Sequence, residues 1–150
     1  PLAGYPLYLW HCDVKGNYSL YDQTDRNYLR GVGISDQNGL INFKTIFPGC
    51  YPGRWPHMHF EVFENATSAV SGSKALLTAQ LAMPEKECHA AYQANQLYTD
   101  SIEHLKYTSL ERDGIFNDNT KAQSEQQTLT MQGDATTGYT ANVTVGLKLS

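Results

Sequence analysis

Apolar and polar residues alternate along much of the first half of the chain, with the period of two that is typical of β-strands. Residues 5–12 are apolar at both alternating positions, which predicts a strand in the interior of a sheet. Residues 27–35 and 40–47 predict two more strands, one on either side of Asn38-Gly39. This dipeptide favours a tight hairpin turn, because both of its residues tolerate positive φ.

Residues 56–63 show the most regular alternation in the chain. Side chains two positions apart on a strand share one face. One predicted face carries His57, His59, Glu61 and Phe63, and the other carries Met58, Phe60 and Val62. The first face therefore combines two imidazoles with a carboxylate, whereas the second face is apolar.

The second half of the chain predicts three further strands and one helix. The strands are expected at 74–83, 126–133 and 138–149, and the helix at 84–98. Pro84 suits the first position of that helix, and the early glutamates favour its N-terminal dipole. The polar segment 99–126 predicts mostly irregular structure.

Together these elements predict an all-β protein: an antiparallel β-sandwich, immunoglobulin- or prealbumin-like, with one short helix and long loops. A chain of 150 residues has the size of one domain, spanning 1–150. The chain opens inside a strand-like run without an initiator Met. We therefore expect that an N-terminal strand region is missing from it.

Composition narrows the classes of partner. Hydrophobic residues make up 41% of the chain without a long apolar run, so no membrane span is expected. The net charge is −4 and the lysines and arginines are scattered, which argues against nucleic acid as a partner. Only 17% of residues are charged, and this composition favours an extracytoplasmic or secreted protein. The sequence predicts no particular oligomeric state.

The three cysteines, Cys12, Cys50 and Cys88, are too few for a disulfide framework. Their number fits one disulfide with one free thiol, and the sequence does not say which two would pair. Outside the H-x-H pair, His11 is interpreted as structural, and His89 and His104 as surface residues.

His57 and His59 lie one pleat repeat apart on one predicted face, close enough to bind one metal ion. Glu61 on the same face supplies a third ligand for zinc or ferrous iron. An H-x-H pair on a strand is also common among surface histidines and hydrogen-bonded core histidines, so the pair by itself does not decide between a metal site and ordinary structure.

Three longer segments carry a family resemblance: YLWHCDVKGNYSLYD, YLRGVGISDQNGLINFKTIFPGCYPGRWPHMHF and LLTAQLAMP. They are similar to the intradiol ring-cleavage dioxygenases, and most similar to the small extracellular-type branch of that family. The resemblance covers residues 5–83, with weaker similarity at 113–118 and 138–146. The chain has no room for the extra helical domain of the catechol 1,2-dioxygenases.

The resemblance implies one non-haem iron(III) ion per chain, bound by Tyr18, Tyr51, His57 and His59. Phenolate oxygen is a hard anionic donor that suits ferric iron better than zinc. The resemblance also implies three catalytic side chains: Tyr51 as a ligand that leaves the metal when substrate binds, and Arg54 and Gln80 beside the reacting carbon. Taken alone, Arg54 would be a surface residue and Gln80 a strand glutamine bonded to the backbone.

The activity implied is cleavage of a catechol-type aromatic diol by O₂ to a cis,cis-muconate-type diacid. Two alternatives stay open at this point. One is a zinc or ferrous enzyme that uses His57, His59 and Glu61, and the other is a non-catalytic transthyretin-like binding module. The loop between Tyr51 and His57 is shorter than in the protocatechuate and catechol enzymes, and Gly53 stands where the protocatechuate type has Trp. Both features predict a more open pocket.

Overall fold

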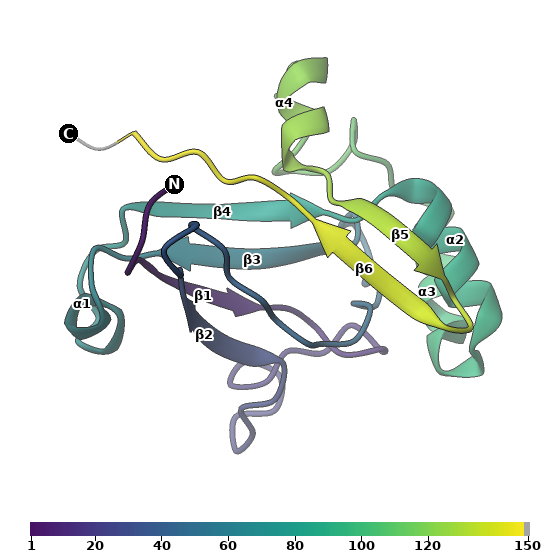
Figure 1. The fold of residues 1–150 in the computed structure, drawn as a ribbon. Coiled ribbons are helices and arrows are strands. Elements are labelled where there is room, and N and C mark those ends of the chain that lie inside the picture. The colour runs from purple at the N-terminus through teal and green to yellow at the C-terminus, as the bar shows by residue number, and fades with distance from the viewer. Residues whose placement is uncertain (149–150) are drawn as a thin grey trace.

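The computed structural model describes residues 1–148, and most of its regular structure lies in two antiparallel sheets (Figure 1). The larger sheet has the strand order β2-β1-β3-β4. Its strands are β1 (Pro6–Trp10), β2 (Arg30–Ile34), β3 (His57–Val62) and β4 (Leu77–Ala82). The smaller sheet is a hairpin of β5 (Thr130–Asp134) and β6 (Gly138–Asn142). The interior position expected for the first strand is confirmed, because β1 lies between β2 and β3.

The register of the larger sheet aligns four side chains across it. Trp10 on β1 lies opposite Arg30 on β2 and opposite His59 on β3, and His59 in turn lies opposite Gln80 on β4. Residues directly opposite in an antiparallel sheet share a face. Arg30, Trp10, His59 and Gln80 therefore form one row on the same face of the sheet.

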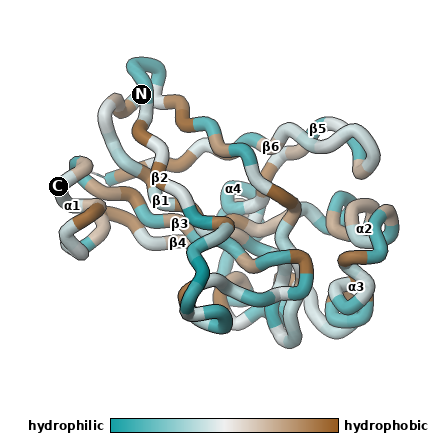
Figure 2. The backbone as a smooth tube through the Cα atoms, turned by 90° about the horizontal axis from the view of Figure 1, so that it is seen from below, coloured by the Kyte–Doolittle hydropathy of each residue, from teal (hydrophilic) through white to brown (hydrophobic). Residues whose placement is uncertain are grey.

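The opposite face of this sheet forms the core. Its centre includes the buried side chains of Met58, Phe60, Val62 and Leu81. Apolar residues of the C-terminal segment that follows β6, Val143, Val145 and Leu147, pack against this core, and Figure 1 shows that segment running across the sheet. Hydrophobic and hydrophilic segments are interspersed along the whole chain (Figure 2). The expectation of antiparallel sheets is confirmed, and a specifically immunoglobulin- or prealbumin-like arrangement stays a prediction.

The predicted strand at 40–47 is wrong. The turn before it forms, since Asp36 donates its backbone N–H to the carbonyl of Leu40 at 3.0 Å. The chain then crosses the face of β2 instead of pairing with its edge. Ile41 lies so close to Gly33 that any Cβ at that position would overlap it, and Phe43 lies 3.8 Å from a Cβ built at Gly31. The glycines of β2 thus admit a covering segment where an alternating pattern predicts a neighbouring strand.

The prediction of a single helix is also wrong. The helices are α1 (Ala66–Val70), α2 (Glu85–Ala94), α3 (Thr99–Leu105) and α4 (Lys121–Gln127), with a 3₁₀ turn η1 (Gln96–Tyr98). Pro84 is the N-cap of α2 rather than its first residue. Helix α3 buries only Ser101 and Leu105. Because so few of its residues are buried, its sequence shows little apolar periodicity, and the segment was predicted to be irregular. Helix α4 begins with a capping box between Thr120 and Gln123, a signal that the sequence contains.

The three cysteines are all buried and free, so the disulfide that their number would fit does not form. Along residues 1–148, each helix falls short of the length and apolarity that crossing a membrane demands.

Candidate metal centre

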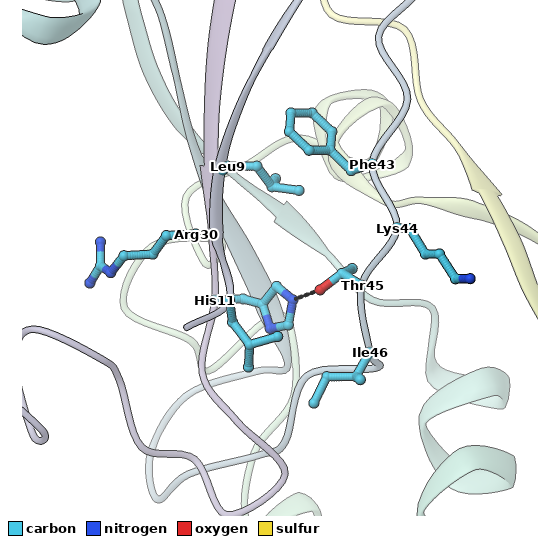
Figure 3. Close-up of a pocket in the computed structure, with 9 residues that line it drawn as sticks. Leu9, His11, Arg30, Phe43, Lys44, Thr45 and Ile46 are labelled. Atoms are coloured by element: carbon cyan, nitrogen blue, oxygen red, sulfur yellow. Dashed lines mark hydrogen bonds between the residues drawn. The ribbon is translucent and has the colours of Figure 1, made fainter. Parts of the chain in front are cut away.

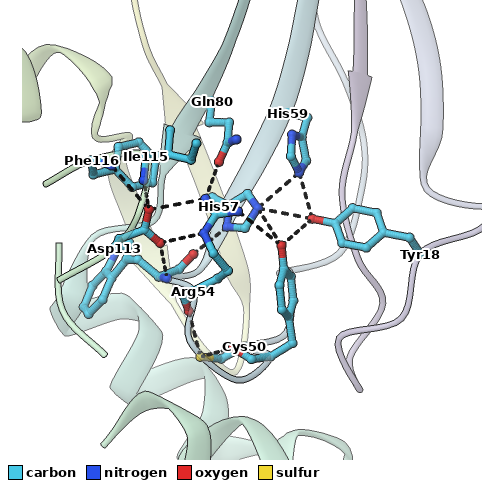
Figure 4. Close-up of polar contacts among 11 residues, drawn as sticks. Tyr18, Cys50, Arg54, His57, His59, Gln80, Asp113, Ile115 and Phe116 are labelled. Atoms are coloured by element: carbon cyan, nitrogen blue, oxygen red, sulfur yellow. Dashed lines mark hydrogen bonds and ion pairs between the residues drawn. The ribbon is translucent and has the colours of Figure 1, made fainter. Parts of the chain in front are cut away.

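Two tyrosines and two histidines converge on one point of the larger sheet (Figure 4). Tyr18 comes from the loop after β1, Tyr51 from the loop before β3, and His57 and His59 from the start of β3. The Tyr18 hydroxyl lies 3.0 Å from His59 Nε2, 3.2 Å from His57 Nε2 and 3.5 Å from the Tyr51 hydroxyl. The Tyr51 hydroxyl lies 3.1 Å from His57 Nε2, and the two Nε2 atoms are 3.1 Å apart.

The two loops that carry the tyrosines touch each other. The Gly49 N–H donates to the carbonyl of Asp13 at 3.1 Å, and a Cβ at Gly49 would lie 2.6 Å from the same oxygen. Only glycine permits this approach. Within the first loop, the Tyr18 N–H donates to Asp22 Oδ2 at 2.7 Å. These contacts place both phenols beside the histidines of β3.

The environment of both histidines keeps their rings neutral, and that of His57 also leaves its Nε2 available as a ligand. His57 Nδ1 lies 2.5 Å from the carbonyl of Trp55 and donates its hydrogen there, so the lone pair is on Nε2. Burial lowers the pKa of His57 to about 3. Burial, with the charges of Arg54 and Arg30, lowers the pKa of His59 to about 4. Both rings are therefore neutral at pH 7, as metal ligands must be.

The donor set fits a trivalent metal ion. Donor atoms bound about 2 Å from one ion lie roughly 3 Å apart, and the five separations given above are 3.0–3.5 Å. Burial raises the pKa of both Tyr18 and Tyr51, so the phenols stay neutral unless a cation offsets the cost of their charge. A bound metal ion supplies that cation and converts a phenol to phenolate. Two phenolates and two imidazoles are a hard, anionic set that suits iron(III).

Arg54 lies beside the four donors, with Nη1 3.5 Å from the Tyr51 hydroxyl. Its Nε donates to Asp113 Oδ2 at 2.9 Å and its Nη2 to Asp113 Oδ1 at 3.3 Å. Nη2 also donates to Gln80 Oε1 at 2.6 Å. Arg54 and Gln80 are thus joined to each other at the edge of the cluster, although they come from different elements. All six residues that the resemblance singled out lie together.

Comparison with solved structures identifies the fold of the chain. No protein family model matches the chain. An intradiol ring-cleavage dioxygenase from Tetranychus urticae superposes with a TM-score of 0.78 at 23% identity, over 98% of this chain and 72% of that one. The dioxygenase domain of a carbohydrate-binding fusion protein from Streptomyces sp. SirexAA-E superposes with a TM-score of 0.56 at 23% identity, over 94% of this chain and 66% of that one. The chain has the fold of the intradiol ring-cleavage dioxygenases.

One curated relative is similar to this chain in sequence over a short segment. Catechol 1,2-dioxygenase from Pseudomonas sp. (strain EST1001) is 35% identical over 52 residues, which is 34% of this chain. The match covers only 17% of the length of that relative. The resemblance recognised in the sequence is confirmed.

The alternative triad of His57, His59 and Glu61 is not formed. Glu61 Oε1 instead accepts a hydrogen bond from Thr78 Oγ1 at 3.2 Å. Among residues 1–148, no three side chains of His, Cys, Asp or Glu are grouped to hold a metal ion. The alternation of β3 puts Glu61 on the face of the histidines, as predicted, but one further pleat repeat carries it away from the two Nε2 atoms.

Asp113 is the functional residue that the sequence analysis missed. Its side chain is fully buried, and it accepts the backbone N–H groups of Trp55 at 2.7 Å and Ile115 at 2.8 Å as well as the Arg54 guanidinium. Burial alone would raise its pKa, but Arg54 and the backbone donors hold it below its usual value. The weak similarity at 113–118 was the one signal in the sequence, and that similarity did not mark a role for Asp113.

Helices α2 and α3 support the Tyr51 loop, which the sequence analysis also missed. His104 Nδ1 lies 2.7 Å from the carbonyl of Cys50, so the interpretation of His104 as a surface residue is wrong. The Tyr92 hydroxyl donates to the carbonyl of Pro48 at 2.9 Å. His11 lies outside the cluster, with its ring nitrogens 2.8 Å from the Cys12 carbonyl and 2.7 Å from Thr45 Oγ1, and His89 is exposed. Both agree with the sequence analysis.

Proposed function

We propose that the protein is a non-haem iron(III) intradiol dioxygenase, which cleaves a catechol-type diol with O₂ to a cis,cis-muconate-type diacid. The observation that carries this proposal is the convergence of two phenol oxygens and two imidazole nitrogens beside a fixed arginine. Both atoms of O₂ enter the diacid, so the reaction needs no further oxidant or reductant.

Tyr18, Tyr51, His57 and His59 would hold one iron(III) ion per chain. When bound, the ion supplies a Lewis acid that draws electron density from the diol. The protein's part is to keep both imidazoles neutral and oriented, and to hold the two phenols where their ionisation is favoured only beside a cation.

Tyr51 is the ligand that gives way to substrate in this proposal. It lies on a loop and is partly exposed, whereas Tyr18 is 9% exposed. A loop residue can turn away without breaking a strand. As it leaves, the Tyr51 phenolate would take up one of the two phenolic protons of the diol, and a hydroxide displaced by the diol would take up the other. Tyr18 stays in place, because the rings of Tyr21 and His59 still contact it when Tyr51 turns away.

Arg54 acts on the negative charge that develops in the diol. The Asp113 carboxylate and Gln80 fix its guanidinium, so its charge needs little reorganisation when the reaction proceeds. A preorganised cation of this kind stabilises the transition state more than a mobile one does. Gln80 lies opposite His59 in the sheet, so it faces the same substrate and also sets the position of Arg54.

The surroundings of Tyr51 favour an open pocket. Gly53 is exposed, and a Cβ built there meets no atom within 4 Å. Gly53 therefore places no side chain where the protocatechuate type carries a tryptophan. We infer that this side of the site admits catechols with substituents.

A visible spectrum tests the proposal. Tyrosinate bound to iron(III) absorbs visible light, so the protein loaded with one equivalent of ferric iron should be red to burgundy. Adding catechol without oxygen should shift that band as Tyr51 is exchanged for substrate. Admitting ¹⁸O₂ should then give a ring-opened diacid that contains both labelled atoms. A colourless protein that binds zinc instead, or a protein that binds catechol without turnover, would contradict the proposal.

A further inference from the structure

Arg30 is a charged residue on the face of the larger sheet that also carries His59. It has no part in the proposed function. It is the first residue of β2 and lies directly opposite Trp10. Arg30 is also one of the residues that line a pocket of about 450 Å³, together with His11 and Thr45. Figure 3 shows the Arg30 side chain turned away from those two residues.

All three guanidinium nitrogens of Arg30 donate hydrogen bonds. Nε donates to Ser19 Oγ at 2.9 Å and Nη2 donates to the Ser19 carbonyl at 2.7 Å. Nη1 donates to the Tyr8 hydroxyl at 2.7 Å. Ser19 is only 1% exposed and directly follows Tyr18. The two hydrogen bonds to Ser19 therefore link the residue next to Tyr18 to β2, the edge strand of the sheet.

The same guanidinium also reaches the ring stack behind His59. It lies 6.0 Å from the ring centroid of Trp10 and 4.8 Å from that of Tyr21. The Trp10 ring is stacked on the His59 ring, with centroids 4.9 Å apart and planes at 10°. The Tyr8 ring is also stacked on the Trp10 ring, with centroids 5.0 Å apart. Arg30 therefore contacts Ser19, which follows Tyr18, and Trp10, which is stacked on His59.

The loop that carries Tyr18 needs such a tie. Residues 11–29 contain no named helix or strand within the part of the chain that the structure describes. Leu20, two residues beyond Tyr18, has φ 65°, a conformation that costs energy for a residue with a Cβ. A loop with this strain keeps its shape only when other contacts hold it.

We propose that Arg30 is a positioning residue that holds Tyr18 and His59 ready for the metal ion. The inference rests on the proposed function, because it takes those two residues as ligands. Lysine is not an equivalent, since a single ammonium cannot reproduce the planar fork that binds both oxygens of Ser19 and the Tyr8 hydroxyl.

The test compares Arg30→Lys and Arg30→Gln with Arg26→Gln, whose arginine is exposed in the same loop. Iron(III) affinity is measured by competition with a chelator, and the unfolding temperature is measured with and without iron. We expect both Arg30 variants to bind iron about 10- to 100-fold more weakly, the usual effect of losing a group that orients a ligand. Their visible band should shift, and iron should raise their unfolding temperature less than it raises that of the wild type. Arg26→Gln should match the wild type.

Two milder variants keep the inference testable if an Arg30 variant does not fold. Ser19→Ala and Tyr8→Phe each remove one acceptor, and each should weaken iron binding by a smaller factor. The metal-free Ser19→Ala protein should also be cleaved faster by trypsin after Arg26. Arg30 or Ser19 variants with wild-type iron affinity and an unshifted band would overturn the inference and leave the proposed function intact. A wild-type protein that takes up no ferric iron would overturn both.

Discussion

The hydrogen bond from His57 Nδ1 to the Trp55 carbonyl determines what that imidazole can do. It uses the nitrogen that faces away from the cluster and leaves the Nε2 lone pair directed at Tyr18 and Tyr51. Burial keeps the ring neutral by lowering its pKa to about 3. An imidazole that is neutral and oriented in advance loses no proton and little conformational freedom when a metal ion binds.

Replacing Tyr18 by Phe tests the phenol that this histidine faces. Tyr18→Phe removes one anionic oxygen with almost no change in volume, so we expect weakened iron binding, a changed visible band and a large loss of turnover. Metal analysis, the visible spectrum and the rate of diacid formation measure these effects. Tyr21→Phe is the matched control, because Tyr21 is 63% exposed and Phe keeps its ring. Full colour and turnover in Tyr18→Phe would show that Tyr18 is not a ligand.

Arg54 should affect catalysis far more than metal binding. In Arg54→Ala we expect iron content to stay near that of the wild type, while kcat falls on the order of 10² to 10³, the usual cost of losing one preorganised electrostatic partner. Steady-state kinetics on iron-loaded protein measure it. Arg112→Ala removes an exposed arginine and should leave kcat unchanged. Normal turnover in Arg54→Ala would return Arg54 to a structural role.

At the scale of elements, helices α2 and α3 and the turn η1 between them act as a scaffold for the Tyr51 loop. Three carbonyl oxygens of the loop accept hydrogen bonds from side chains of these elements. Phe47 accepts from Tyr98, Pro48 from Tyr92 and Cys50 from His104. Ser101 of α3 also accepts the Cys50 N–H at 2.9 Å. The backbone on either side of Tyr51 is thus anchored, so in the proposed function only the Tyr51 side chain would need to move when substrate binds.

Tyr92→Phe measures the strength of that base. The Tyr92 ring is 1% exposed and its hydroxyl is the donor to Pro48. Removing it leaves a buried carbonyl without this partner, which costs about 1–3 kcal/mol of the free energy of unfolding. Urea denaturation of the metal-free protein measures the loss. Tyr107→Phe, at a tyrosine that is 77% exposed, should cost far less, and equal effects in the two variants would contradict the proposed support.

At the scale of the whole molecule, Asp113 links distant parts of the chain. It lies 59 positions from Arg54 in the sequence and binds its guanidinium in two places. It also accepts the N–H of Trp55, whose carbonyl orients His57. One buried carboxylate therefore joins the C-terminal half of the chain to both the proposed catalytic arginine and a proposed metal ligand.

Asp113→Asn should destabilise the metal-free protein by about 3 kcal/mol, because it leaves the Arg54 charge without its partner. The pKa of Asp113 is below its usual value, so its contribution is complete above about pH 4 and is lost as the pH falls through the folded-state pKa. The difference in free energy of unfolding between wild type and variant should therefore be constant near neutral pH and shrink in acid. A difference that persists unchanged in strong acid would show that the carboxylate charge is not its cause.

Several features of this protein were predictable from local sequence alone. Short apolar or alternating runs correctly predicted β1, β2, β3 and β4, because burial of both faces or of one face of a strand imposes such patterns. The same pattern was wrong for 40–47, where the segment covers glycines of β2 instead of joining the sheet. Helix α3 was missed because it packs through few residues, so its apolar period is weak.

For the site, the sequence by itself determined the donor types and their order, since His57 and His59 share a face whenever this strand forms and the motifs around Tyr18, Tyr51, Arg54 and Gln80 resemble one family. Only the tertiary structure decided which side chains hold those groups in place. It excluded Glu61, joined Arg54 to Asp113 and brought Arg30 to Ser19. The physical reason is that a side chain's orientation depends on partners far away in the chain, and their proximity is set by the packing of the whole fold rather than by local pattern.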